Sequence, residues 1–206
     1  MKTDNRLSVL SNHTRSFIYT DFRSHVQALL EQGLVTGEKQ GEDMVAYTTI
    51  NETRMNRIEK HGVLSENLLH TIRTMGKKIQ LLCITEGWCG DSAQILPYVA
   101  QMCKANEDCI DFEIILRDDN PEWMDKYLTN GSRSIPVFIA FDEVGNELFH
   151  WGPRPNTLVE EIKAWKASTE PTFKANEIKE KIHLWYARNK GADLMNEWND
   201  LFQSVA

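Results

Sequence analysis

The chain has 206 residues, of which 41% are hydrophobic and 26% are charged. This balance is typical of a globular protein with one core fold and extensions, and it argues against a disordered or fibrous chain. The 30 Asp and Glu residues outnumber the 23 Lys and Arg residues, and the net charge of −7 argues against general attraction to nucleic acid or to a membrane. The N-terminal residues mix charged and apolar side chains, and no later stretch approaches the roughly 18 apolar residues of a spanning helix. We therefore expect a cytoplasmic protein without a signal peptide or membrane anchor.

Residues 1–76 are predicted to form a helical extension. Apolar residues recur mostly at spacings of three and four in 17–30 and again in 44–61, where Gly62 fits the end of a helix. Ser65 and the residues after it start a third, short helix. None of these segments carries a catalytic signature.

Residues 77–168 change in character and predict an α/β domain. The run 78–85 is short and nearly continuously apolar, which is typical of a strand buried on both faces. Further strands are predicted at 110–116, 135–141 and 147–151, the last two joined by a hairpin turn. Helices are predicted at 92–104, from Pro121 to about 130, and at 157–168. This order implies a mixed sheet with helices on both faces.

Residues 169–206 return to a helical pattern. Apolar residues recur at helical spacing on both sides of Gly191, so this C-terminal extension has an apolar face that must pack on something. We expect it to dock on the sheet domain. Formation of a homodimer through this face is the alternative.

The chain has four cysteines, too few for a disulfide scaffold at this length. Cys89 lies between the end of a predicted strand and the start of a predicted helix. The free N–H groups of the first helical turn therefore favour its thiolate. Strand ends in α/β folds open into ligand-binding crevices, and we therefore expect Cys89 to be exposed and nucleophilic. A buried structural cysteine is the alternative. Cys83, Cys103 and Cys109 are expected to be free packing residues.

Three motifs follow one another in the predicted domain: WCG at 88–90, DDNP at 118–121, and RSIP at 133–136 directly before an apolar strand. In this order and spacing they resemble the thioredoxin family, over about residues 77–168. The wider pattern, ITEGWCGDSAQ at 84–94 followed by RSIP at 133–136 and WGPRP at 151–155, is similar to a bacterial thioredoxin-like subfamily with helical extensions. The resemblance implies a thioredoxin-like fold.

The resemblance also implies a substrate groove beside Cys89. Pro136 is expected to follow a cis peptide bond and to face Cys89, because proline makes the cis form accessible and offers no N–H to compete for a substrate strand. Ser134 and Ile135 would offer backbone groups to an extended substrate. The groove would be completed by Trp88, Gly90, Asp91, Arg133, Gly152 and Arg154. The two arginines lie on loops that the family fold brings near Cys89, where they either hold an anionic partner or are simply solvated.

The departures from the family pattern concern the reacting groups. Ser92 stands where thioredoxins have their second cysteine, so no neighbouring thiol can resolve a mixed disulfide on Cys89. Asp91 replaces the common proline, and its carboxylate opposes ionisation of the cysteine, unless it serves only as favourable first-turn charge. Cys83 occupies the place of the buried carboxylate that assists proton transfer, and Thr85 that of a tryptophan beneath the site.

Three functional hypotheses follow. In the first, the protein is a monothiol thiol–disulfide oxidoreductase: Cys89 attacks a protein or low-molecular-weight disulfide, Ser92 donates a hydrogen bond to the thiolate, Pro136 shapes the groove, and an external thiol completes turnover. In the second, it is a redox-inactive binding module on the same fold. In the third and weaker one, the CGDS segment marks a glutaredoxin-like protein that uses an iron–sulfur cluster or glutathione. Under the first hypothesis we expect no cofactor and no metal.

Overall fold

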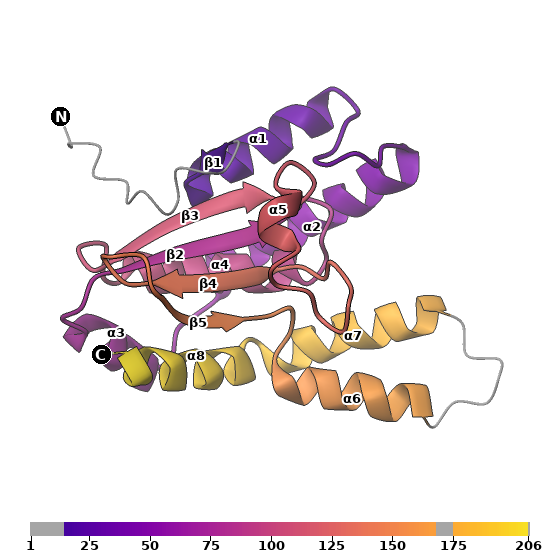
Figure 1. Cartoon of the computed structure of the whole chain (residues 1–206). Helices are drawn as coiled ribbons and strands as arrows, with labels where there is room; N and C mark the ends of the chain where they lie inside the picture. The colour runs from indigo at the N-terminus through magenta and orange to yellow at the C-terminus, as the bar shows by residue number, and fades with distance from the viewer. Residues whose placement is uncertain (1–14, 168–174, 206) are drawn as a thin grey trace.

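The computed structural model describes residues 15–167 and 175–205. A five-stranded sheet forms its centre, with the strand order β1-β3-β2-β4-β5 (Figure 1). Strand β2 pairs parallel with β3 and antiparallel with β4, whereas β1 and β5 lie antiparallel at the two edges. The strands are β1 Ser16–Phe17, β2 Ile79–Thr85, β3 Ile110–Leu116, β4 Val137–Phe141 and β5 Glu147–Trp151. The sheet is therefore mixed, as predicted.

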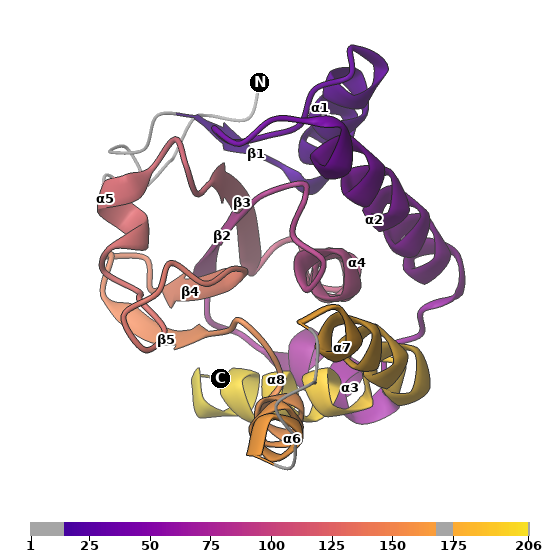
Figure 2. The same cartoon turned by 90° about the vertical axis from the view of Figure 1, so that its right-hand side faces the viewer.

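Helices cover both faces of this sheet, most of them on one side. They are α1 Tyr19–Glu31, α2 Glu42–His61, α3 Glu66–Thr74, α4 Ser92–Lys104, α5 Pro121–Met124, α6 Asn156–Ala167, α7 Ala175–Asn189 and α8 Ala192–Val205. Figure 2 shows α2, α4, α7 and α8 on one side of the sheet and α5 on the other. None of the helices within these ranges is both long and apolar enough to cross a membrane.

Strand β2 explains how the two faces form separate cores. Successive side chains of a strand point to opposite faces. Leu81 and Cys83 accordingly join the large cluster that includes α4 and α8, whereas Leu82 and Ile84 join a smaller cluster with Trp123 of α5. All residues of β2 are buried, which confirms the prediction from its apolar run.

Two predicted elements were wrong in extent. Phe17 was predicted inside a helix, but Ser16 and Phe17 pair with β3 as β1, a strand of two residues that is too short to show an alternating pattern. The helix after Pro121 ends at Met124 rather than near residue 130. Tertiary contacts override its helical pattern, because the Tyr127 hydroxyl donates to Glu147 of β5 at 2.8 Å and the following chain forms turns.

The C-terminal extension packs on the sheet domain through aromatic side chains of α8. Trp198 of α8 is fully buried, with ring centroids 5.2 Å from Phe138 and 5.8 Å from Trp151. Phe202 stacks edge-on against Trp198 and Phe149. Aromatic packing of this kind on strands β4 and β5 fixes α8 to the sheet.

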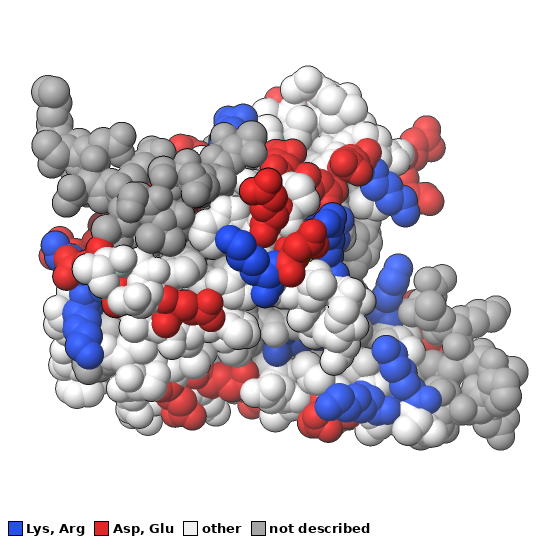
Figure 3. All heavy atoms as spheres, viewed as in Figure 1, with Lys and Arg blue, Asp and Glu red and all other residues white. Residues whose placement is uncertain are grey.

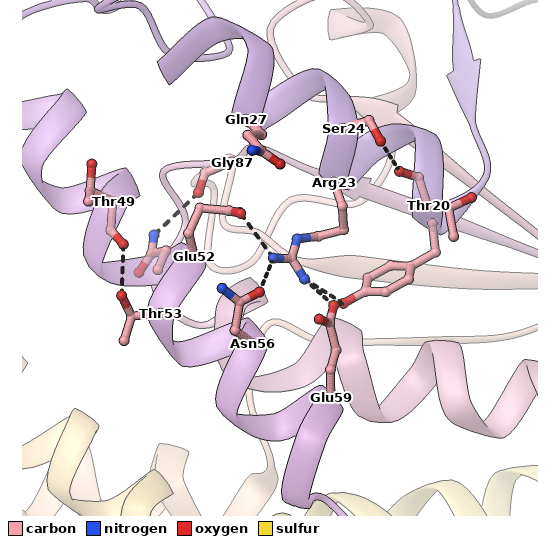
Figure 4. Close-up of polar contacts among 12 residues, drawn as sticks. Thr20, Arg23, Ser24, Gln27, Thr49, Glu52, Thr53, Asn56, Glu59 and Gly87 are labelled. Atoms are coloured by element: carbon pink, nitrogen blue, oxygen red, sulfur yellow. Dashed lines mark hydrogen bonds and ion pairs between the residues drawn. The ribbon is translucent and has the colours of Figure 1, made fainter. Parts of the chain in front are cut away.

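Within the N-terminal extension, a polar network holds α1 against α2 (Figure 4). The Arg23 guanidinium bonds to Glu52 at 2.9 Å, to Asn56 at 2.8 Å and to Glu59. On the face shown in Figure 3, acidic and basic side chains of the described residues lie interspersed rather than in one large patch. The Arg23 network holds α2 in place, and α2 in turn packs along α4 next to the Cys89 loop.

Candidate functional site

The thiol of Cys89 lies between the start of α4 and the residue before Pro136. The Ser92 backbone N–H points to Cys89 Sγ at 3.5 Å, and Sγ donates to the Ile135 carbonyl at 3.2 Å. The Ile135–Pro136 peptide bond is cis, as the resemblance implied. The structure thus brings Cys89, Ser92, Ile135 and Pro136 together at one end of the sheet.

Cys89 is buried, which contradicts the expectation of an exposed nucleophile. Only 6% of its surface is exposed. The reason lies in the extensions: a Cβ on the neighbouring Gly90 would come within 2.6 Å of the Tyr47 hydroxyl of α2 and 3.0 Å of the His183 ring of α7. Tyr47 and His183 also contact each other, with their polar atoms 3.2 Å apart. Two helices from opposite ends of the chain therefore cover the loop that carries Cys89.

Asp91 links this loop to two other parts of the chain. The Arg154 guanidinium, which follows β5, binds both carboxylate oxygens of Asp91 at 2.9 and 2.6 Å. The Tyr186 hydroxyl of α7 donates to the same carboxylate at 2.9 Å. Asp91 is therefore more than first-turn charge on α4, because it holds α7 and the loop after β5 against the site.

The surroundings of Cys89 favour the neutral thiol. Burial and, secondly, the Asp91 carboxylate raise the pKa of Cys89 to about 11. The Ser92 hydroxyl and the backbone N–H groups of Ser92 and Asp91 lower this pKa but do not overcome the two effects. Cys89 is therefore protonated at neutral pH in this conformation.

The Ser92 hydroxyl has a buried partner whose contact with Ser92 was not predicted from the sequence. Its oxygen lies 2.6 Å from the Thr85 hydroxyl oxygen at the end of β2. When Thr85 donates in this pair, the hydroxyl hydrogen of Ser92 is free to point to Cys89. Thr85, noted in the sequence only as a replacement for tryptophan, thus fixes the orientation of Ser92.

The start of the same loop is bonded to the N-terminal extension. The Gly87 N–H donates to the Thr36 hydroxyl at 2.8 Å, and the Asn51 side chain donates to the Gly87 carbonyl at 3.3 Å. The buried Glu86 carboxylate accepts the Asp118 N–H at 2.9 Å, and burial raises the pKa of Glu86 to about 7. Together with the bonds from Arg154 and Tyr186 to Asp91, these contacts hold residues 86–91 from three regions of the sequence: the N-terminal extension, the segment after β3, and the part of the chain after β5.

Of the remaining predicted groove residues, Trp88 and Gly152 lie at the site, whereas the Arg133 side chain binds Asp125. The Arg117 guanidinium lies 4.7 Å from the centre of the Trp88 ring. A Cβ on Gly152 would overlap the Pro136 carbonyl oxygen, so only glycine fits there. Arg133 forms a two-pronged ion pair with Asp125, each bond 2.7 Å long. Of the two alternatives expected for Arg133, this surface ion pair favours the one in which Arg133 does not hold an anionic partner beside Cys89.

Ser134 and the other cysteines complete the comparison with the predicted site. The Ser134 N–H donates to the Ser132 carbonyl at 2.8 Å, so this backbone group is occupied by the chain itself. All four cysteines are free, and burial raises the pKa values of Cys83 and Cys103. Across the two described ranges, no group of three or more His, Cys, Asp or Glu side chains is placed to hold a metal ion.

Comparison with known proteins places this site in a family. A family model described as thioredoxin matches residues 37–166. The chain belongs to the thioredoxin family. The match begins within the segment predicted as an N-terminal extension. None of the curated proteins matches this thioredoxin-family chain.

Two solved structures share its fold. One is a protein of unknown function from Pseudomonas aeruginosa, 15% identical, with a TM-score of 0.57 over 92% of this chain and 99% of that one. The other is an HIV epitope scaffold, 16% identical, with a TM-score of 0.54 over 92% of this chain and 100% of that one. At these identities the likeness shows the fold alone.

Proposed function

We propose that this protein carries out monothiol thiol–disulfide exchange at Cys89, from a resting state in which helix α7 covers the site. The position of Cys89 Sγ carries the proposal. The sulfur lies 3.5 Å from the Ser92 N–H at the start of α4 and 3.2 Å from the Ile135 carbonyl. A donor on one side and a strand-like backbone on the other suit a thiolate that meets an extended disulfide-bearing chain.

The exchange uses one thiol of the protein and one from outside. The Cys89 thiolate attacks one sulfur of a protein or low-molecular-weight disulfide, forms a mixed disulfide and releases the other sulfur as a thiol after it takes up a proton. An external thiol then attacks the mixed disulfide, forms a new disulfide with the bound group and returns Cys89 to its thiol form. Ser92 cannot perform this second step, because it has no sulfur. A pool of small thiols, as in a reducing cytoplasm, would supply the second reactant.

The covered state explains how such a cysteine would stay unreactive until a substrate is present. Exchange needs the thiolate, and both burial and the Asp91 carboxylate oppose its formation. Separation of α7 from Asp91 would hydrate Cys89 and lower its pKa. We therefore place substrate binding together with displacement of α7.

The second candidate function is a redox-inactive binding module on the thioredoxin fold. The same burial and raised pKa of Cys89 favour it, together with Ser92 in place of a resolving thiol. The glutaredoxin-like alternative has less support, because Trp88 before the cysteine fits thioredoxins better. An iron–sulfur cluster in the glutaredoxin-like alternative would require further ligands outside this site.

Reduction of glutathione-mixed disulfides, with glutathione as the external thiol, tests the proposal. We expect the wild type and the matched control Cys109→Ser to accelerate the reaction, and Cys89→Ser to fall to the uncatalysed rate. Equal rates for the wild type and Cys89→Ser would refute thiol exchange. Partners that a Cys89→Ala variant retains in a pulldown would then support the binding module.

A further inference from the structure

A cavity of about 240 Å³ lies behind the Cys89 loop. It is bounded by the C-terminal end of α2, the first half of α4 and the C-terminal end of α7, three helices that Figure 2 shows gathered on the same side of the sheet. The polar residues that line it are Arg57, His61, Gln94, Tyr98, Tyr186 and Lys190. This cavity is distinct from the groove at Pro136.

The lining is basic in a protein whose net charge is −7. Arg57, His61 and Lys190 contribute basic side chains, and no Asp or Glu lines the cavity. Within the described part of the chain, none of the three forms an ion pair, and Arg57 reaches only the Gln94 amide oxygen at 3.5 Å. The positive charges of Arg57 and Lys190 have no carboxylate partner in this lining, so an anion bound beside them would be stabilising.

The floor of the cavity is held rigidly. The Tyr98 ring lies between two glycines, since a Cβ on Gly62 would come within 3.0 Å of the ring and one on Gly191 within 2.9 Å. The Tyr98 hydroxyl donates to the Lys190 carbonyl at 2.9 Å. Lys190 itself, directly after α7, has a φ of 51°, an uncommon left-handed conformation. The floor of the cavity is thus fixed, whereas Arg57, His61 and Lys190 are exposed around it.

We infer that this cavity binds a small multivalent anion, of the phosphate or polycarboxylate class. Guanidinium and ammonium groups both form strong charge-assisted hydrogen bonds with phosphate and carboxylate oxygens. The volume lies below the range of about 300–1,000 Å³ that takes drug-sized ligands, which favours a small ligand. The site does not depend on the proposed exchange reaction.

The cavity is also connected to Cys89 by one side chain. Tyr186 lines the cavity and donates its hydroxyl hydrogen to Asp91 at 2.9 Å. An anion bound between α2 and α7 would hold α7 in place and keep this hydrogen bond closed. The bound anion therefore stabilises the covered state of the Cys89 loop.

Thermal unfolding with added ligand tests the site. Pyrophosphate and citrate are titrated separately at constant ionic strength with NaCl, so that the two arms distinguish phosphates from polycarboxylates. We expect saturable stabilisation by at least one of them, because a ligand of the folded state raises the unfolding temperature with its concentration. Calorimetric titration of the same samples gives the dissociation constant.

Variants then locate the binding. Arg57→Gln and Lys190→Gln should each weaken the affinity about tenfold, which corresponds to about 1.4 kcal/mol. The matched control Lys78→Gln removes one exposed positive charge outside the cavity lining and should bind as the wild type does. Cys89→Ser should also bind normally, which separates this inference from the exchange reaction. No saturation by either anion, or equal weakening in Lys78→Gln, would overturn the inference.

Discussion

The two helices of the C-terminal extension are attached to the sheet domain by different kinds of contact. Helix α8 buries Trp198 and Phe202 among the aromatic residues of β4 and β5. Helix α7 reaches the Cys89 loop with polar groups, through the bond from Tyr186 to Asp91 and the contact of His183 with Tyr47. Apolar burial is non-directional and strong, whereas each hydrogen bond contributes little net stability. Helix α7 also packs Ile182 and the Tyr186 ring into the core. We therefore expect α8 to contribute more to stability, and the polar contacts of α7 to be the part of its attachment that opens.

The largest expected effect is on α8. Trp198→Ala removes a fully buried ring from the centre of an aromatic cluster, and large-to-small changes of this kind cost about 3–5 kcal/mol. Urea unfolding should show this loss in the free energy of unfolding. Leu184→Ala on α7 is the control, because Leu184 is 48% exposed and its removal should have little effect. A similar cost for both variants would remove the distinction between the helices.

The next effect concerns the loop that α7 covers. The pKa of Glu86 rises from an ordinary value of 4.5 to about 7 in the fold, so ionising this buried carboxyl above pH 7 costs about 3 kcal/mol. Between these two values the folded state binds more protons than the unfolded state, and the free energy of unfolding therefore falls as the pH rises. Glu86→Gln should remove this contribution while its amide oxygen still accepts the Asp118 N–H.

Unfolding by urea at pH 5 and pH 8 measures the Glu86 contribution. The difference between the two pH values should shrink in Glu86→Gln and persist in Glu122→Gln, whose side chain is exposed on α5. An unchanged pH dependence in Glu86→Gln would show that Glu86 is hydrated and that the loop is looser than its contacts with the N-terminal extension indicate.

A smaller effect is expected at the polar contact of α7. Tyr186→Phe keeps the buried ring and removes one hydrogen bond to a carboxylate, a loss of about 1.5–3 kcal/mol. Hydrogen exchange should increase in α7 but not in α8, and Cys89 should become more accessible to alkylation. Tyr127→Phe is the matched control, because it removes a hydroxyl bond to Glu147 away from the site. Equal exchange rates in α7 before and after Tyr186→Phe would contradict a helix held by this bond.

The smallest effect separates the two arginines. Arg133 pairs with Asp125 on the surface, and Arg133→Ala should leave the alkylation rate of Cys89 unchanged. Arg154→Ala leaves the Asp91 carboxylate without its ionic partner, so the alkylation rate at pH 8 should change. If the alkylation rate of Cys89 changed only in Arg133→Ala, Arg133 rather than Arg154 would act at the site.

The sheet and the position of the site could be predicted from the sequence because their signals are local. The apolar run of β2 and the hairpin before β5 show their strands directly, and the motifs at 88–90 and 133–136 place Cys89 opposite Pro136. The two-residue strand β1 has no such pattern. The early end of α5 depends on a contact between Tyr127 and Glu147, which lie 20 residues apart.

The burial of Cys89 could not be predicted in the same way. Its cover comes from Tyr47, His183 and Tyr186, which lie far from the WCG motif in the sequence and carry no pattern of their own. The role of Asp91 was equally hidden, because Arg154 and Tyr186 meet it only after the chain has folded. Side chains that become functional through remote contacts leave no local signal.

The pH dependence of Cys89 alkylation tests the central claim most directly. Iodoacetamide modification is followed by mass spectrometry of the peptide that contains Cys89, which separates it from the other three cysteines. A buried thiol with a pKa of about 11 should react slowly, with a rate that still rises at pH 10. Tyr186→Phe should increase the rate at every pH. Rapid alkylation of the wild type that reaches a plateau below pH 8 would show an exposed thiolate and contradict the covered site.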